Sequence, residues 1–126
     1  EKPKCKFEKK IFPFYSNNLS PFNTQNTFLL GSLLKYYFLF VGVGRMHDIW
    51  ASYYLQFIKK INVVYNASSV IQKRNKHDIM VDLKDEFHGI KNNFYFANSI
   101  IEKKFKLKSF YSIRSLKAYS YYKKHF

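Results

Sequence analysis

The stretch "GRMHDIW" contains three side chains that could act on one ligand: Arg45, His47 and Asp48. Asp48 is the only acidic residue between Glu8 and Asp78. A carboxylate can take a proton from an attacking hydroxyl within hydrogen-bond reach, while an imidazole and a guanidinium can hold hydroxyls or phosphates. The alternative is a structural role, because Asp at the start of a helix commonly caps it. Both roles for Asp48 are therefore open on these residues alone.

Two further polar clusters could contribute to the same chemistry. "NTQNT" at residues 23–27 can bind sugar hydroxyls or simply form a turn, and composition alone favours the turn. "QKRNKHD" at residues 72–78 lies between a predicted strand and a predicted helix, where ligand-binding loops are common. A basic loop of this kind can equally be a solvated surface segment. Because these clusters and residues 45–48 are polar islands in apolar surroundings, we expect all three to converge on one concave face.

Hydrophobic spacing predicts the elements that would hold these clusters. Apolar residues at helical intervals follow the two glycines of "VGVG", and Asp48 stands at the expected N-cap of that helix; they are Trp50, Tyr54, Phe57, Ile58 and Ile61. "INVVYNASSVIQ" predicts one or two strands. "HDIMVDLKDEFHGI" predicts a helix that Asp78 caps and Gly89 ends, with Met80, Leu83, Phe87 and Ile90 on one side and Asp82, Asp85 and Glu86 on the other.

The flanking segments give a coarser picture. Residues 11–27 contain prolines and clustered small polar residues, which predict a loop. The apolar residues 28–44 predict buried strand or helix, and they include Lys35 and fall short of the roughly 20 residues of a membrane span. Residues 92–104 and 107–124 can each be helical, and the basic tail at residues 103–126 is expected to form a peripheral helix outside the site. The whole chain is therefore expected to be α+β, helix-rich with a few strands.

Length, cysteine content and net charge exclude few classes of function. The chain has 126 residues, enough for one modest domain, and its one cysteine, Cys5, allows neither an internal disulfide nor a Cys-based zinc site. The net charge of +14 would favour polyanions. A general bias toward Lys, Asn, Ile, Tyr and Phe explains that charge equally well. A basic nucleic-acid-binding module, with tail aromatics stacking on bases, is the alternative function, and a non-catalytic scaffolding fragment is a third.

The three clusters also occur in a recognisable order. "PFNTQNTF", "GRMHDIWASYYLQ" and "QKRNKHDIMVDLKDEFHGIKNN" together resemble the STELLO-type glycosyltransferase-like family, which is similar in turn to the reversibly glycosylated polypeptides. The resemblance covers residues 20–93 and leaves a basic aromatic tail, residues 94–126, outside it. It implies a GT-A-like fold that uses a nucleotide-sugar donor. Since no Asp-x-Asp motif is present, residues 1–126 are expected to be one partial domain, the C-terminal, acceptor-side part of that fold.

The resemblance also implies roles for individual residues. Asp48 matches the acid that lies near the acceptor hydroxyl and acts as general base. His77 matches a late histidine that approaches the donor phosphates or a divalent metal, Mn²⁺ or Mg²⁺. His47 stands where relatives often carry an acid or a small hydroxyl residue. The candidate substrate-binding residues are Gln25, Asn26, Arg45, His47, Arg74 and Asn75.

The expected activity is transfer of a sugar from a nucleotide sugar to a glycan or another hydroxyl acceptor. It requires an upstream nucleotide-binding half as partner, and activity of this segment alone is left open. Nucleic acid is not the favoured partner, and no transmembrane segment is expected. The favoured location is the cytoplasm or a membrane surface, with the Golgi lumen as the alternative if the eukaryotic family members are the right comparison.

Overall fold

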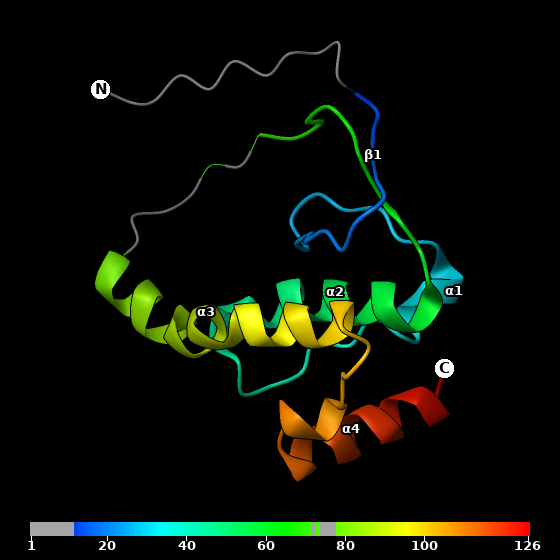
Figure 1. Cartoon of the computed structure of the whole chain (residues 1–126). Coiled ribbons are helices and arrows are strands. Elements are labelled where there is room, and N and C mark those ends of the chain that lie inside the picture. Colours follow the sequence, from blue (N-terminus) through cyan, green and yellow to red (C-terminus); the bar gives the residue numbers. More distant parts are fainter. Residues whose placement is uncertain (1–11, 72, 74–77) are drawn as a thin grey trace.

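The computed structural model describes residues 12–71, 73 and 78–126, and it is α+β, helix-rich with a small two-stranded sheet (Figure 1). In chain order the elements are β1 (Phe14–Ser16), α1 (Gly31–Leu34), the 3₁₀ turn η2 (Gly44–Met46), α2 (His47–Lys59), β2 (Val63–Tyr65), α3 (Ile79–Ile101), the 3₁₀ turn η3 (Leu107–Ser109) and α4 (Ile113–Lys124). Helices α2 and α3 pack together, with the sheet on one side of them and α4 on the other (Figure 1).

The sheet joins two segments that are far apart in the sequence. Strands β1 and β2 pair antiparallel, with Phe14 opposite Tyr65 and Ser16 opposite Val63. The expectation of a loop over residues 11–27 therefore missed a short strand, because the aromatic residues of β1 are flanked by the turn residues that dominate the segment. The prediction of one or two strands after α2 is confirmed by β2.

Helix α2 forms where the apolar spacing predicts it, but it begins slightly earlier. Met46 is its N-cap residue and makes no side-chain cap bond, while Asp48 lies in the first turn. The prediction that Asp48 is the N-cap is therefore wrong, because the 3₁₀ turn η2 leads directly into the helix. The helix ends at Lys60, whose left-handed backbone (φ 53°) lets its N–H donate to the Gln56 carbonyl at 2.9 Å.

Helix α3 is longer than the sequence predicts. Asp78 caps it as expected, since its Oδ1 accepts the Met80 N–H at 2.9 Å. The helix then runs without interruption to Ile101, so Gly89 does not end it and residues 92–104 do not form a separate helix. A Cβ on Gly89 would lie 2.4 Å from the Cβ of Met46. Gly89 is therefore present for a close contact with η2, and not as a helix terminator.

A second glycine completes this contact from the other side. Gly44 has a φ of +60°, and a Cβ there would lie 1.5 Å from the carbonyl oxygen of Asp85. Only glycine fits a position that combines a left-handed backbone with contact against a helix backbone. The pair Gly44 and Gly89 therefore lets η2 dock directly on α3.

The core is mainly aromatic. Trp50 of α2 stacks on Phe96 of α3 with ring centroids 4.3 Å apart, and Phe40 stacks on Tyr111 at 4.2 Å. Tyr119 of α4 is also buried against this cluster. Such pairs add about 0.5–1.5 kcal/mol each beyond the area they bury. The basic tail therefore contributes side chains to the core, and the expectation of a merely peripheral helix is wrong in this respect.

The apolar segment 28–44 is mostly irregular, with α1 as its one helix. The expectation of a buried strand or helix is therefore wrong for most of the segment: Phe40 and Val43 enter the core, whereas Phe28 and Leu30 remain exposed. Phe40 and Val43 lie shortly before η2, which docks on α3, while Phe28 and Leu30 line a surface groove.

Candidate functional site

The segment that leads into residues 23–27 is held by two buried polar side chains of α2. Gln56 accepts the Ser20 N–H at 3.0 Å and donates to the Ser20 carbonyl at 2.6 Å. Ser52 accepts the Phe22 N–H at 3.2 Å and donates to the Ile49 carbonyl at 2.7 Å. These bonds satisfy buried polar groups on both partners and fix where residue 23 leaves the helix surface.

Residues 23–27 fold into a turn that their own side chains stabilise. The Asn23 side chain accepts the Gln25 N–H at 3.1 Å, which is an Asx turn. The Thr27 hydroxyl donates back to the Asn23 carbonyl. The turn predicted from composition is therefore present, and Thr24, Gln25 and Asn26 lie on its exposed side.

Asp48 connects this turn to helix α2. Its Oδ2 accepts the Thr24 N–H at 3.3 Å, and its Oδ1 accepts the Ile49 N–H at 2.8 Å. The residue is half-buried and lies in the first turn of the helix, where the partial positive charge of the helix terminus favours a carboxylate. The first two polar clusters of the sequence are therefore in direct contact.

Tyr37 lies on the other side of Asp48. Its hydroxyl donates to the Asp48 main-chain carbonyl, with an O···O distance of 3.4 Å. Burial raises the pKa of Tyr37 above its ordinary value of 10.0, and the charge of Asp48 raises it further. Tyr37 therefore stays protonated at neutral pH and serves as a donor.

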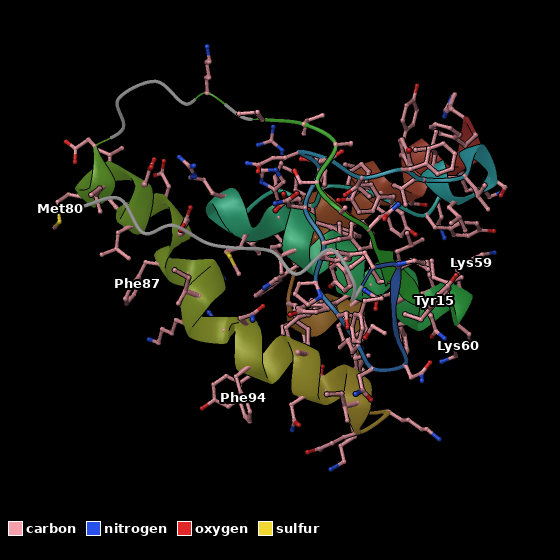
Figure 2. The ribbon with its side chains drawn as sticks, turned by 90° about the horizontal axis from the view of Figure 1, so that it is seen from above. Tyr15, Lys59, Lys60, Met80, Phe87 and Phe94 are labelled. Atoms are coloured by element: carbon pink, nitrogen blue, oxygen red, sulfur yellow. The ribbon has the colours of Figure 1, made fainter. Side chains whose placement is uncertain are left out.

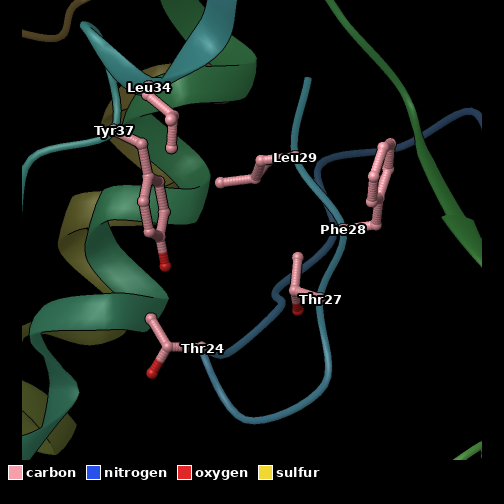
Figure 3. Close-up of a pocket in the computed structure, with 6 residues that line it drawn as sticks. All are labelled: Thr24, Thr27, Phe28, Leu29, Leu34 and Tyr37. Carbon is pink, nitrogen blue, oxygen red and sulfur yellow. The ribbon is translucent and has the colours of Figure 1, made fainter. Parts of the chain in front are cut away.

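A cavity of about 360 Å³ lies between the turn and this tyrosine (Figure 3). Its lining residues are Thr24, Thr27, Phe28, Leu29, Leu34 and Tyr37. Two of them, Thr24 and Tyr37, are the hydrogen-bond partners of Asp48 described above. The cavity therefore combines two threonines with an apolar wall, and its volume falls within the usual range for ligand sites. Asp48 is not one of its lining residues and is connected to it through Thr24 and Tyr37.

A larger groove of about 950 Å³ lies between the turn and β2. Its polar lining includes Asn23, Asn26, Asn62, Asn66 and Ser69. Asn26 also accepts a hydrogen bond from the Ser69 hydroxyl at 3.3 Å. This bond brings the turn next to the segment that leads toward the third polar cluster.

Arg45 and His47 have partners of their own. Arg45 binds Asp82, and its Nε lies 3.1 Å from a carboxylate oxygen of Glu86. In His47, Nδ1 lies 2.8 Å from the Gly44 carbonyl and is therefore the protonated nitrogen that donates to it. Arg45 thus fixes η2 on α3, whereas Asp48 holds the turn at residues 23–27.

Most of the third cluster lies outside the described residues. This applies to Gln72, Arg74, Asn75 and His77. The convergence of residues 72–78 with the other two clusters, and the metal role of His77, therefore stay predictions. Within residues 12–71, 73 and 78–126, no group of three or more His, Cys, Asp or Glu side chains could hold a metal ion. Across the same residues, no helix combines the length and the apolar character needed to cross a membrane.

Several residues that shape this site were not singled out from the sequence. Ser52 and Gln56 are polar residues four positions apart in a helix whose other buried residues are aromatic or aliphatic. That spacing was the available signal, because a polar pair on a buried helix face needs partners from another segment. Tyr37 gave no such signal, since its partner Asp48 lies in another segment of the chain.

Comparisons of this chain with models of protein families, with curated proteins and with solved structures find no match. A function is therefore inferred from the residues and the geometry described above.

Proposed function

We propose that this chain forms the acceptor-side part of a sugar-transfer site, with Asp48 as the base. The observation that carries the proposal is the hydrogen bond from the Thr24 N–H to the Asp48 carboxylate, beside the cavity of about 360 Å³. That bond joins two of the three motifs on which the resemblance to STELLO-type glycosyltransferases rests. The GT-A-like fold, the nucleotide-sugar donor and a separate nucleotide-binding half are part of the same proposal.

The chemistry assigned to Asp48 is proton removal from the acceptor. The carboxylate takes the acceptor O–H proton while the acceptor oxygen bonds to the anomeric carbon of the donor sugar. The bond from that carbon to the donor phosphate breaks, and the nucleotide leaves with the electron pair. The Thr24 and Ile49 N–H groups use two of the roughly four acceptor positions of a carboxylate, so Asp48 has capacity for an acceptor hydroxyl.

The lining of the cavity suits a sugar. The Thr24 hydroxyl can exchange hydrogen bonds with sugar hydroxyls, and the Thr27 hydroxyl, which donates to the Asn23 carbonyl, can accept one. Phe28, Leu29 and Tyr37 offer surface for the apolar face of the ring. A divalent metal near His77 would neutralise the phosphates of the leaving nucleotide. Arg74 and Asn75 would act on the donor side with it.

Binding to the isotopically labelled chain tests the proposal directly. A panel of methyl glycosides is titrated while backbone amide resonances are followed, and the amides of Thr24 and Ile49 are expected to shift. Asp48→Asn keeps the side-chain size but removes the charge, and it is expected to weaken these shifts. Asp85→Asn, a matched loss of one exposed carboxylate on α3, is expected to leave them unchanged. Equal shifts in all three proteins, or none at any sugar concentration, would contradict the proposal.

A second function, binding of nucleic acid, is favoured by one observation on α4. Tyr121 is exposed, and Lys123 and Lys124 occupy the last turn of the same helix. An exposed aromatic ring beside lysines can stack on a base while the ammonium groups bind phosphates. Filter binding to single-stranded RNA at increasing salt tests it, since tight binding at physiological salt, weakened by Tyr121→Ala, would support this function over sugar transfer.

A further inference from the structure

Helix α3 carries an exposed apolar stripe along its length. Its members recur at alternating intervals of three and four residues, and we name them the heptad stripe: Met80, Leu83, Phe87, Ile90, Phe94, Ala97 and Ile101. The six large side chains are between 48% and 72% exposed. Figure 2 shows Met80, Phe87 and Phe94 projecting from the same side of α3, away from helix α2. This spacing is that of the a and d positions of a coiled coil.

The six large members of the stripe lie apart from the face that α3 turns toward the core, and the seventh, Ala97, is partly buried against that core. That inner face consists of Gly89, Phe96 and Ile100, which are buried. At about 100° per residue, the centre of the heptad stripe lies about a third of a turn around the helix from the inner face. A surface helix normally has one apolar face, so the second one requires a separate explanation, and an exposed patch of this size is typical of an interaction site.

We propose that the heptad stripe is the interface through which two copies of this chain form a parallel two-stranded coiled coil. With roughly 200 Å² for a large side chain, the exposed parts of the six members amount to roughly 700 Å² per copy. That area is close to the roughly 800 Å² that each partner buries in a stable interface.

Charges beside the stripe favour a second copy in parallel orientation. Glu86 occupies a g position, and Lys91 occupies the e position of the following heptad. A parallel coiled coil places these positions of the two helices opposite each other. One carboxylate oxygen of Glu86 lies 3.1 Å from the Nε of Arg45 in the same chain, and the other oxygen pairs with Lys91 of the second copy, twice per dimer. An antiparallel pair would instead bring Lys84 opposite Lys91 of the second copy, which is repulsive.

The position of the inner face also permits this arrangement. Because the core packs on α3 about a third of a turn from the heptad stripe, a two-fold axis parallel to the helix places the two cores on opposite sides of the helix pair. The pairing therefore requires no displacement of α2 or η2. None of the six residues that line the cavity of about 360 Å³ belongs to α3, so the proposal does not depend on sugar transfer.

Sedimentation equilibrium of the full chain tests the interface. The wild-type chain is expected to be a dimer, and Phe94→Asp is expected to raise the dissociation constant by about 30-fold or more, as loss of a central aromatic anchor does. Tyr95→Asp is the matched control, because Tyr95 is 67% exposed, Phe94 is 71% exposed, and both rings belong to the same aromatic pair. Circular dichroism checks that both variants keep their helices. A wild-type monomer up to its solubility limit, or equal dissociation by both variants, overturns the proposal.

Lys91→Glu tests the orientation. In the parallel dimer it places a second carboxylate opposite Glu86, and it is expected to weaken dimerisation by about 3- to 10-fold. In an antiparallel dimer the same change would create an attraction to Lys84 and strengthen it, which overturns the parallel assignment. Co-sedimentation with vesicles of phosphatidylcholine and phosphatidylserine tests whether the stripe instead binds a membrane surface. If the wild-type chain is a monomer that binds these vesicles, and Phe94→Asp abolishes the binding, the stripe is a membrane-binding surface and the dimer proposal is overturned.

Discussion

Two parts of the stretch "GRMHDIW", Gly44 with Arg45 and then Asp48, have different surroundings. At its start, Gly44 contacts the backbone of Asp85, and Arg45 pairs with two acidic side chains of α3. At Asp48 the contacts are single hydrogen bonds to a turn beside a cavity. The difference teaches that one short motif can combine a rigid anchor with a site that has room for a ligand. The anchor fixes the helix start, and the helix start positions the carboxylate.

The largest expected effect concerns Asp48, the part of the motif beside the turn at residues 23–27. If Asp48 is the base, Asp48→Asn should reduce the rate of sugar transfer by roughly 10²–10⁴-fold in a protein that includes the nucleotide-binding half. The measurement is single-turnover transfer from a radiolabelled nucleotide sugar. The free energy of unfolding should fall by only about 1 kcal/mol, because Asn keeps one acceptor oxygen for the Ile49 N–H and loses the one that accepts the Thr24 N–H. Near-normal transfer under conditions where chemistry limits the rate would leave Asp48 with a structural role alone.

Next in size is a change at the anchor. Gly89→Leu should lower the free energy of unfolding by about 3 kcal/mol or more, because the new side chain would overlap Met46 and the Val43 carbonyl. Urea denaturation followed by circular dichroism measures it. Gly31→Ala is the control, since a Cβ at Gly31 meets no described atom within 4 Å. A small loss in Gly89→Leu would show that η2 is not tightly docked.

Alkaline pH should act on both regions through their tyrosines. Burial raises the pKa of Tyr37 beside Asp48, and it raises the pKa of Tyr111 and Tyr119 in the core, all above the ordinary value of 10.0. The folded state thus holds these protons more tightly than the unfolded state. Stability should be constant below about pH 10 and then fall by about 1.4 kcal/mol per pH unit for each such tyrosine.

Urea denaturation at a series of pH values, with tyrosinate absorbance as a second signal, measures this decline. The variants Tyr37→Phe and Tyr111→Phe should each make the free energy of unfolding fall less steeply with pH above pH 10, by about 1.4 kcal/mol per pH unit. A slope that stays the same in both variants would assign the alkaline loss of stability to other groups.

The smallest expected effect is that of a substitution at Arg45, which should change stability without changing the contact of Asp48 with the turn. Arg45→Met should cost about 1 kcal/mol of stability, because its ion pairs are partly exposed and screened by water. The amide resonance of Thr24, which reports the bond to Asp48, should stay in place. A large shift of that resonance would show that the anchor and the site are coupled more closely than their contacts indicate.

Local patterns in the sequence predicted what local forces decide. The apolar spacing after "VGVG" gives α2, and the Asp78 cap gives the start of α3. Gly89 was misjudged because glycine is typical both of helix ends and of close helix contacts, and only the position of Met46 distinguishes them. The sequence does not carry that tertiary information in the residues next to Gly89.

The candidate site was predictable to a similar degree. The turn at residues 23–27 follows from its composition, whereas its bond to Asp48 depends on how Ser52 and Gln56 hold the preceding segment. The side of α3 that faces outward was also not evident. Its apolar and acidic sides lie where the spacing predicts them. The acidic side faces η2, because Arg45 pairs with Asp82 and Glu86. On the apolar side, Phe87 and Ile90 remain exposed.

The short pairing of β1 with β2 makes the sheet the least stable part of the described fold. Three residues on each strand close the chain between Ser16 and Val63, while the helices share a continuous aromatic core. The free energy needed to separate the strands is therefore much smaller than that of global unfolding. Their amide hydrogens should exchange with solvent well before those of α2 and α3. Val63, Val64 and Tyr65 of β2 line the groove of about 950 Å³, so separation of the strands would free one wall of that groove while the core stays folded.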